Sequence, residues 1–234
     1  MDHPHASGKR AGPLIAWLVF VGILVLIGYA GRLSDTETPD DLAYQWTSSI
    51  AAFIQYWFFL AIIVAIALVS KMELREAFAL RRPRSWPRAL GLALLALVLI
   101  YAGAFAYERV LSLFGDWSPT DEQGLVPDGW DSSRAAPFIA FFLVVTVLAP
   151  VVEELTYRGL GISLLQPWGV TLAICVTGLL FGAAHGLIVG LPILAFFGVV
   201  VGWLRVRTDS IYPSMALHAT FNGVALIAAV SGAA

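Results

Sequence analysis

The chain has 234 residues, of which 59% are hydrophobic and only 13% are charged, and its formal net charge at pH 7 is −2. A soluble domain of this size carries charges on about a quarter of its residues. The composition therefore excludes an ordinary soluble globular domain, which would need more polar surface. The small net charge says little about partners, although we expect no nucleic acid among them.

Long apolar runs predict an all-α fold, a polytopic transmembrane helical bundle of about seven spans. Each run approaches or exceeds the ~20 residues that cross the hydrocarbon core as a helix. We expect residues 1–12 to form a disordered tail and residues 13–234 to form a single membrane domain, because the connections are too short for a second one. The runs are 13–31, 47–70, 89–114, 137–152, 169–185, 187–204 and 210–230.

The charged residues between these runs predict the orientation of the chain. Cationic loops stay on the cytoplasmic side of a membrane, so we expect the N-terminus in the cytoplasm and, after seven spans, the C-terminus outside. The short, Ala- and Gly-rich chain further suggests an integral protein of a prokaryotic cell membrane. The basic residues that indicate this orientation are Lys9, Arg10, Lys71, Arg75, Arg81, Arg82, Arg84, Arg88, Arg205 and Arg207.

Segment 71–88 combines most of these cations with apolar residues. One interpretation is a surface element in which basic side chains reach anionic headgroups while the apolar side chains face lipid, namely Met72, Leu74, Ala77, Phe78 and Leu80. The other is a plain cytoplasmic loop that follows the same charge rule. Pro83 and Pro87 end the segment before the third run, and the composition favours neither interpretation.

Ionisable residues also appear inside apolar sequence, where each costs about 3 kcal/mol or more at a helix centre and is a functional hypothesis by default. The first group is Glu153, Glu154 and Arg158. Adjacent helical residues point about 100° apart, so Glu154 can pair with Arg158 four residues on and leave Glu153 free. A lone, partly buried carboxylate can act as a general base or acid. The alternative is an ordinary surface ion pair at a helix end.

Two further groups follow, Phe181-Gly-Ala-Ala-His185 and His218-Ala-Thr-Phe-Asn222. The small residues after Phe181 let another helix approach closely, and His218 and Asn222 lie on one helix face. Alone, His185 fits an interfacial residue and the His218–Asn222 pair fits polar contacts between helices. The other two histidines of the chain lie in the N-terminal tail.

Together the three groups place a carboxylate, two imidazoles and an amide on separate helices. These are the components of hydrolysis, because water needs a base and a developing oxyanion needs donors. The same groups could hold zinc, with Glu153, His185 and His218 as ligands. The His-Glu-x-x-His motif of zinc proteases is absent.

The sequence here resembles a known family. Glu-Glu-x-x-x-Arg at 153–158, Phe-x-x-x-His at 181–185 and His-x-x-x-Asn at 218–222, in this order on successive apolar helices, are similar to the motifs of the CAAX protease and bacteriocin-processing (CPBP) family, also called Abi or type II CAAX prenyl endopeptidases. The resemblance covers about residues 137–225, which would form the catalytic core.

The resemblance implies an intramembrane endopeptidase that hydrolyses a peptide bond of a membrane-associated peptide or protein. It assigns activation of water to Glu153, supporting roles to Glu154 and Arg158, a partner role to His185, and the oxyanion of the scissile carbonyl to His218 and Asn222. We expect glutamate-activated water without a cofactor, because a neutral amide is a better oxyanion donor than zinc ligand; zinc is the alternative.

Two other functions remain open from the sequence. A non-catalytic receptor, scaffold or bacteriocin immunity module would use the same pocket for binding, and a small transporter would use the ionisable residues as a proton relay. Repeated halves, which are common in transporters, are not seen. The Gly198-Val-Val-Val-Gly202 stripe fits either a dimer contact or packing within the bundle.

Depth in the membrane adds one more expectation. Glu153 lies late in a run that enters the cytoplasmic side, whereas His185 lies late in a run that leaves it. Straight helices would place them at different depths. We therefore expect the helix of Glu153 to continue past Arg158 and to turn near Pro167, which gives Glu153 a depth near the middle of the membrane.

Overall fold

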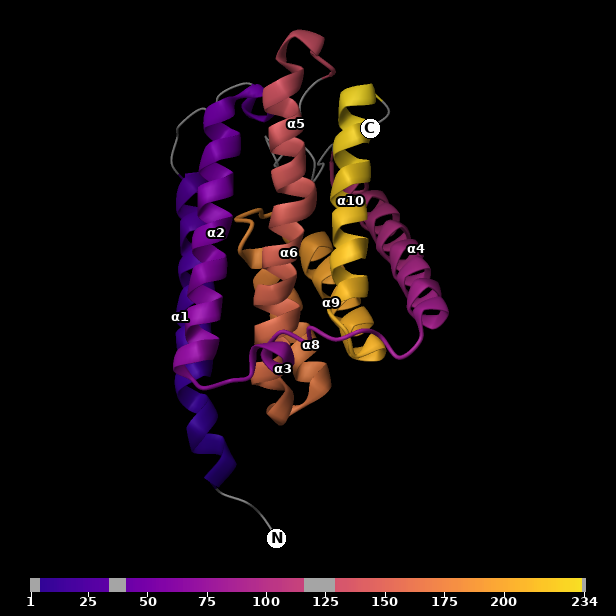
Figure 1. Ribbon diagram of the computed structural model, residues 1–234. Coiled ribbons are helices and arrows are strands. Elements are labelled where there is room, and N and C mark those ends of the chain that lie inside the picture. The colour runs from indigo at the N-terminus through magenta and orange to yellow at the C-terminus, as the bar shows by residue number, and fades with distance from the viewer. Residues whose placement is uncertain (1–4, 34–40, 116–128, 233–234) are drawn as a thin grey trace.

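A computed structural model describes residues 5–33, 41–115 and 129–232, and within these ranges the regular elements are all helices, without a strand (Figure 1). The predicted all-α membrane bundle is confirmed. Six helical segments are long and apolar enough to cross a membrane, and α8 is a shorter apolar helix. The crossing segments are α1 (His5–Leu33), α2 (Trp46–Val69), α4 (Trp86–Leu111), the composite segment 132–168, α9 (Leu191–Thr208) and α10 (Tyr212–Ser231).

The composite segment is one long rod through the centre of the bundle (Figure 1). It continues past Arg158 and turns at Gln166–Trp168, so the expected continuation of this helix is confirmed. Its parts are η2 (Ser132–Arg134), α5 (Ala135–Leu143), η3 (Val144–Leu148), α6 (Ala149–Glu154), η4 (Leu155–Gly161), α7 (Ile162–Leu165) and η5 (Gln166–Trp168).

Two parts of this rod, η3 and η4, are π-helical. In η3 the N–H of Ala149 donates to the carbonyl of Val144, five residues back. The next donor in that pattern would be residue 150, which is proline and has no N–H. The carbonyl of Val145 is therefore released from the helix, as is common where a π-helix serves a site.

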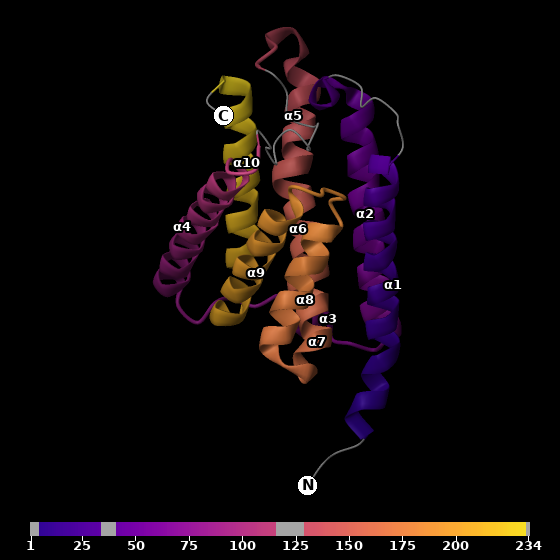
Figure 2. The same cartoon turned by 180° about the vertical axis from the view of Figure 1, so that it is seen from behind.

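Helices α8 (Val170–Ala183) and α9 are an antiparallel pair whose connection lies below the upper ends of α2, α5 and α10 (Figures 1 and 2). Their backbones approach closely because Gly178 and Gly198 face each other. A Cβ added to Gly198 would lie 2.6 Å from the Cα of Gly178. Within the described residues, the small-residue stripe at Gly198 therefore packs inside the bundle.

Helices α1 and α2 stand together on one flank, and α4 leans away on the other flank beside α10 (Figures 1 and 2). The Nε1–H of Trp17 on α1 donates to the carbonyl of Thr156 at 2.9 Å, which ties this flank to the central rod. Helix α1 begins at His5, and the disordered tail expected for residues 1–12 stays a prediction. Residues 1–4 lie outside the described residues.

The segment after α2 differs from the lipid-facing element that we considered. It contains the short helix α3 (Leu74–Ala77), and Ala77, Phe78 and Ala79 are buried in the protein. Phe78 packs against Gly159, and the carbonyl of Ala79 accepts the N–H of Ile211 at 3.1 Å. The interpretation that Ala77 and Phe78 face lipid was wrong, because the absent side chain of Gly159 leaves room for Phe78 inside the bundle.

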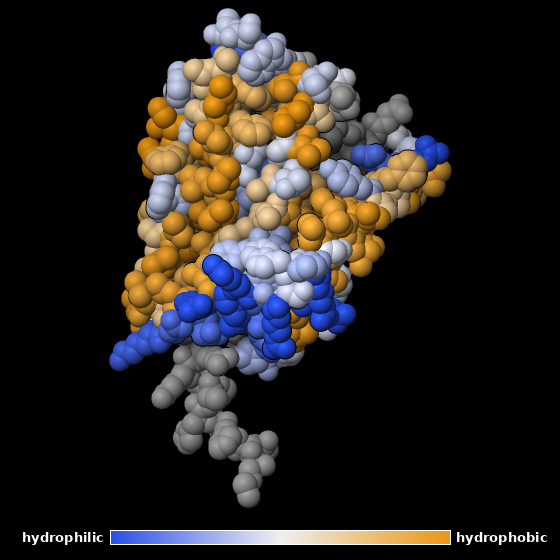
Figure 3. Space-filling model, turned by 45° about the vertical axis from the view of Figure 1, so that its right-hand side comes forward, coloured by the Kyte–Doolittle hydropathy of each residue, from blue (hydrophilic) through white to orange (hydrophobic). Residues whose placement is uncertain are grey.

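The surface supports a membrane location. Large apolar side chains are exposed along α1, α2 and α4, as expected where lipid rather than water is the solvent. Figure 3 shows this apolar belt with strongly hydrophilic residues gathered at the lower end, where the chain begins. The connections at 34–40 and 116–128 lie outside the described residues.

Candidate functional site

A buried ion pair forms the base of the site. Glu154 and Arg158 are both fully buried, and Arg158 Nη1 donates to Glu154 Oε1 at 2.8 Å. Arg158 Nη2 donates to the carbonyl of Gly198 at 3.1 Å, and its guanidinium lies 4.4 Å from the centre of the Phe181 ring. The pairing predicted from the four-residue spacing is therefore present, and the close approach of α9 at Gly198 completes it.

The two glutamates hold the ring of His218 from opposite nitrogens. His218 Nδ1 lies 2.9 Å from Glu154 Oε1, and His218 Nε2 lies 3.6 Å from Glu153 Oε2. An ionised carboxylate only accepts hydrogen bonds, so Nδ1 carries a proton and donates it to Glu154. Nε2 then faces Glu153 Oε2, at a distance that is too long for a direct hydrogen bond.

Tyr56 is the contact that the sequence did not reveal. Its hydroxyl donates to Glu153 Oε1 at 2.7 Å, and it comes from the middle of α2, 97 residues away along the chain. A tyrosine inside an apolar helix is unremarkable by itself. The one available signal was that such a hydroxyl needs a partner when it is buried.

Glu153 also faces a cavity of about 390 Å³. Its side chain is 18% exposed, in contrast to the fully buried Glu154. His185 lines the same cavity from the end of α8, and Tyr56 lines it from α2. The remaining walls come from α1, α2, the central rod and the start of the α8–α9 connection: Leu24, Ile27, Gly28, Gln55, Phe59, Val152, Thr156, Tyr157 and Ala184.

The hydrogen bond of His185 fixes its ring. Nδ1 lies 2.8 Å from the carbonyl of Phe181, which can only accept. Nδ1 therefore donates, and in the neutral ring the lone pair is on Nε2. This is the arrangement of a base or of a metal ligand whose other nitrogen is held by a carbonyl.

Asn222 lies on α10 one turn after His218 but makes a different contact. Its Nδ2 donates to the carbonyl of Val145 at 3.0 Å. This is the carbonyl that the π-helical turn and Pro150 release. One amide N–H of Asn222 is thus committed to the backbone of the central rod, and its second N–H is the remaining donor.

The residues that we considered as zinc ligands do not form a metal-binding cluster. Throughout the described ranges, no group of three His, Cys, Asp or Glu side chains has an arrangement that could hold a metal ion. In particular, Glu153, His185 and His218 are not brought into such an arrangement, although Glu153 and His218 are neighbours.

Comparison with known proteins supports the resemblance. Residues 135–224 match the model of a family described as Type II CAAX prenyl endopeptidase Rce1-like. This range contains all three motifs and confirms the family resemblance for a little over a third of the chain. No curated protein and no solved structure matches the chain. Helices α1, α2 and α4 lie outside the match.

Proposed function

We propose that this chain, whose residues 135–224 carry the match to the type II CAAX prenyl endopeptidase family, is a membrane endopeptidase in which Glu153 activates the attacking water. The observation that carries the proposal is the placement of Glu153. It combines access to a cavity with two defined neighbours, the hydroxyl of Tyr56 and Nε2 of His218.

In the proposed reaction, a water in the cavity gives one proton to Glu153 while its oxygen bonds to the scissile carbonyl carbon. The C–N bond then breaks, and the proton passes from Glu153 to the leaving nitrogen. Proton transfer by a positioned side chain contributes about 10²–10⁴-fold to a rate. The bond from Tyr56 orients the carboxylate, since it occupies Oε1 and leaves Oε2 on the side of His218.

Glu154 and Arg158 act through His218 in this proposal. The charge on Glu154 holds Nδ1–H of His218, and Arg158 holds Glu154. His218 then presents Nε2 toward the reacting groups and, when protonated, can donate to the oxyanion. Asn222 would add its second amide N–H, consistent with the oxyanion role that the resemblance implies; donors of this kind are worth about 10²–10³ in kcat.

The substrate would be a peptide or protein segment at the membrane. The cavity lies between α1, α2 and the central rod, and most of its lining is apolar. An apolar wall with a few polar groups suits a bound peptide whose side chains are hydrophobic. Prenylation is not required by anything in this cavity.

The test is cleavage of a library of membrane-derived peptides by the purified wild type, by Glu153→Gln and by Glu76→Gln, followed by mass spectrometry. Glu76 is an exposed glutamate near the basic end of the bundle, so Glu76→Gln is a control for the loss of one carboxylate. We expect products from the wild type and the control and none from Glu153→Gln.

Two results would contradict the proposal. A cellular function that survives Glu153→Gln, with no products from the wild type, would identify a binding module. Loss of cleavage on addition of a chelator, restored by zinc, would overturn water activation by glutamate alone.

A further inference from the structure

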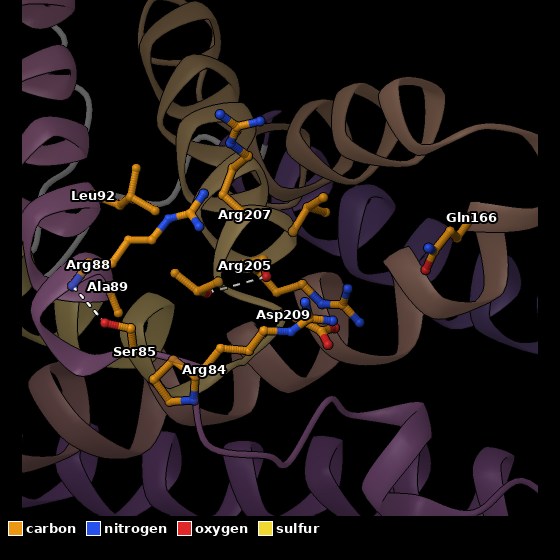
Figure 4. A pocket seen from close by; sticks show the side chains of 12 residues that line it. Arg84, Ser85, Arg88, Ala89, Leu92, Gln166, Arg205, Arg207 and Asp209 are labelled. Carbon is orange, nitrogen blue, oxygen red and sulfur yellow. Dashed lines mark hydrogen bonds between the residues drawn. The ribbon is translucent and has the colours of Figure 1, made fainter.

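A second cavity lies at the basic end of the bundle, far from the glutamates along the central rod. It has a volume of about 410 Å³ and lies between the start of α4 and the end of α9. Four arginines line it: Arg84, Arg88, Arg205 and Arg207. In Figure 4, Arg88 lies on one side of this cavity, and Arg205 extends from α9 toward Gln166 on the other side.

These four cations have no carboxylate partner among the described residues. The acidic residue in the lining, Asp209, is already bound, because its Oδ1 accepts from Arg81 Nη2 at 2.7 Å. Arg81 also pairs with Glu76. These contacts raise the pKa of Arg81. The cavity therefore carries an excess of positive charge that the protein does not neutralise.

Arg205 contributes the most deeply buried positive charge of this cavity. It is only 4% exposed, its Nε has no hydrogen-bond partner within the described ranges, and its Nη2 donates to the hydroxyl of Ser163 at 3.4 Å. Buried polar groups are almost always paired. Arg205 therefore adds a buried positive charge to the wall of the cavity, with no carboxylate of the described residues bound to it.

The N-terminus of α4 adds to the positive electrostatic potential of this cavity. This helix has 26 residues and begins beside the cavity with Ser85 as its N-cap, whose hydroxyl accepts from the N–H of Arg88. The N-terminus of a helix carries about half a positive charge and favours anions such as phosphate. The helix end and the four guanidinium groups therefore attract the same kind of ligand.

The surroundings point to a lipid as the source of that anion. Leu92 and Ala89 form an apolar wall of the cavity itself, and Leu95 and Leu99, three and seven residues after Leu92 on the same face of α4, are 41–47% accessible. Figure 3 shows hydrophilic residues bordering the apolar belt at this end. An acyl chain can follow the apolar face of α4 while its headgroup phosphate lies among the arginines.

We propose that this cavity binds the phosphate group of an anionic phospholipid. Basic pockets between transmembrane helices are suited to such headgroups. The site would anchor the ends of α4 and α9 at the membrane surface. Arg207 takes a peripheral position, since its guanidinium lies 5.9 Å from the centre of the Trp203 ring, whereas Arg84 and Arg88 are exposed at the mouth.

Native mass spectrometry of the purified full chain in neutral detergent tests the proposal, with phosphatidylglycerol, phosphatidylcholine and inorganic phosphate as probes. The variant is Arg84→Gln/Arg88→Gln, which leaves the buried Arg205 in place. The control is Lys71→Gln/Arg82→Gln, which removes two positive charges from the same segment outside the cavity. No protease activity is needed, so the outcome is independent of the proposed function.

We expect one molecule of phosphatidylglycerol to bind to each chain, and to bind more tightly than phosphatidylcholine does. Each basic side chain near an anionic headgroup contributes about five-fold, so the cavity variant should bind roughly 30-fold more weakly. The control should stay within about three-fold of the wild type. If both variants lost the same affinity for phosphatidylglycerol, the effect would come from general surface charge, and the proposed site would be wrong. Displacement of the lipid by millimolar inorganic phosphate would overturn the lipid assignment and leave a site for free phosphate.

Discussion

Removing the charge of Glu154 should strongly destabilise the protein. In Glu154→Gln, the buried guanidinium of Arg158 loses its counter-charge and keeps neutral partners such as the carbonyl of Gly198 and the face of Phe181. Breaking a buried ion pair by neutralising one member costs about 3–5 kcal/mol, because an uncompensated charge stays inside. With about 2–4 °C per kcal/mol for a chain of this size, the midpoint of thermal unfolding should fall by roughly 6–20 °C.

The loss of stability is measured by unfolding the protein in mixed micelles with a rising fraction of SDS. The fluorescence of the eight tryptophans reports the transition. The control Glu76→Gln removes a carboxylate from an exposed pair with Arg81 and should cost less than about 1 kcal/mol. Each single variant, Glu154→Leu or Arg158→Leu, leaves one unpaired buried charge. The double variant Glu154→Leu/Arg158→Leu leaves none, so it should be more stable than the less stable of the two single variants. The buried ion pair would be refuted if the stability losses of the two single variants simply added up in the double variant. It would also be refuted if Glu154→Gln were as stable as the control.

Three further substitutions test individual contacts. Tyr56→Phe removes a hydrogen bond to the charged Glu153, worth about 1.5–3 kcal/mol, so kcat for peptide cleavage should fall about 10- to 100-fold with little change in KM; an unchanged kcat would exclude the orienting role. Gly198→Val places a side chain against the backbone of α8 and should cost about 1–3 kcal/mol or more in SDS unfolding, whereas wild-type stability would contradict the close packing. Asn222→Leu leaves the carbonyl of Val145 without its donor and should cost about 1–3 kcal/mol of stability in the same assay. Asn222→Asp lacks the N–H but keeps the shape of the side chain, so it should lose as much stability. If both variants were as stable as the wild type, the contact between Asn222 and Val145 would be contradicted.

Local spacing predicted the contacts that lie within one helix. The pairing of Glu154 with Arg158 follows from four residues of helical separation and is present as expected. The continuation of the central rod to Gln166–Trp168 followed from the depth that Glu153 needs. Both inferences depend on the geometry of a single helix, which the order of residues determines.

Contacts between distant helices could not be predicted in the same way. Tyr56 reaches Glu153 only because α2 packs beside the central rod, and nothing in the sequence of α2 marks this residue. The contact of Asn222 with Val145 depends on a π-helical turn ahead of Pro150. Phe78 was misread because its burial depends on Gly159, 81 positions away, and an amphipathic pattern carries no information about such a partner.

The division of the cavity between the two parts of the chain has a consequence for substrate choice. The candidate catalytic groups His185, His218 and Glu153 lie within the segment that matches the family, whereas the walls formed by Ile27, Gln55 and other residues of α1 and α2 lie outside it. In the proposed reaction, the matched segment would supply most of the chemistry, and α1 and α2 would supply much of the surface that contacts the peptide. Substitutions on α1 and α2 that line the cavity, Tyr56 excepted, should change which peptide is bound without altering the groups that would cleave it. A search for the substrate should therefore begin from the apolar shape of those walls and not from the family motifs.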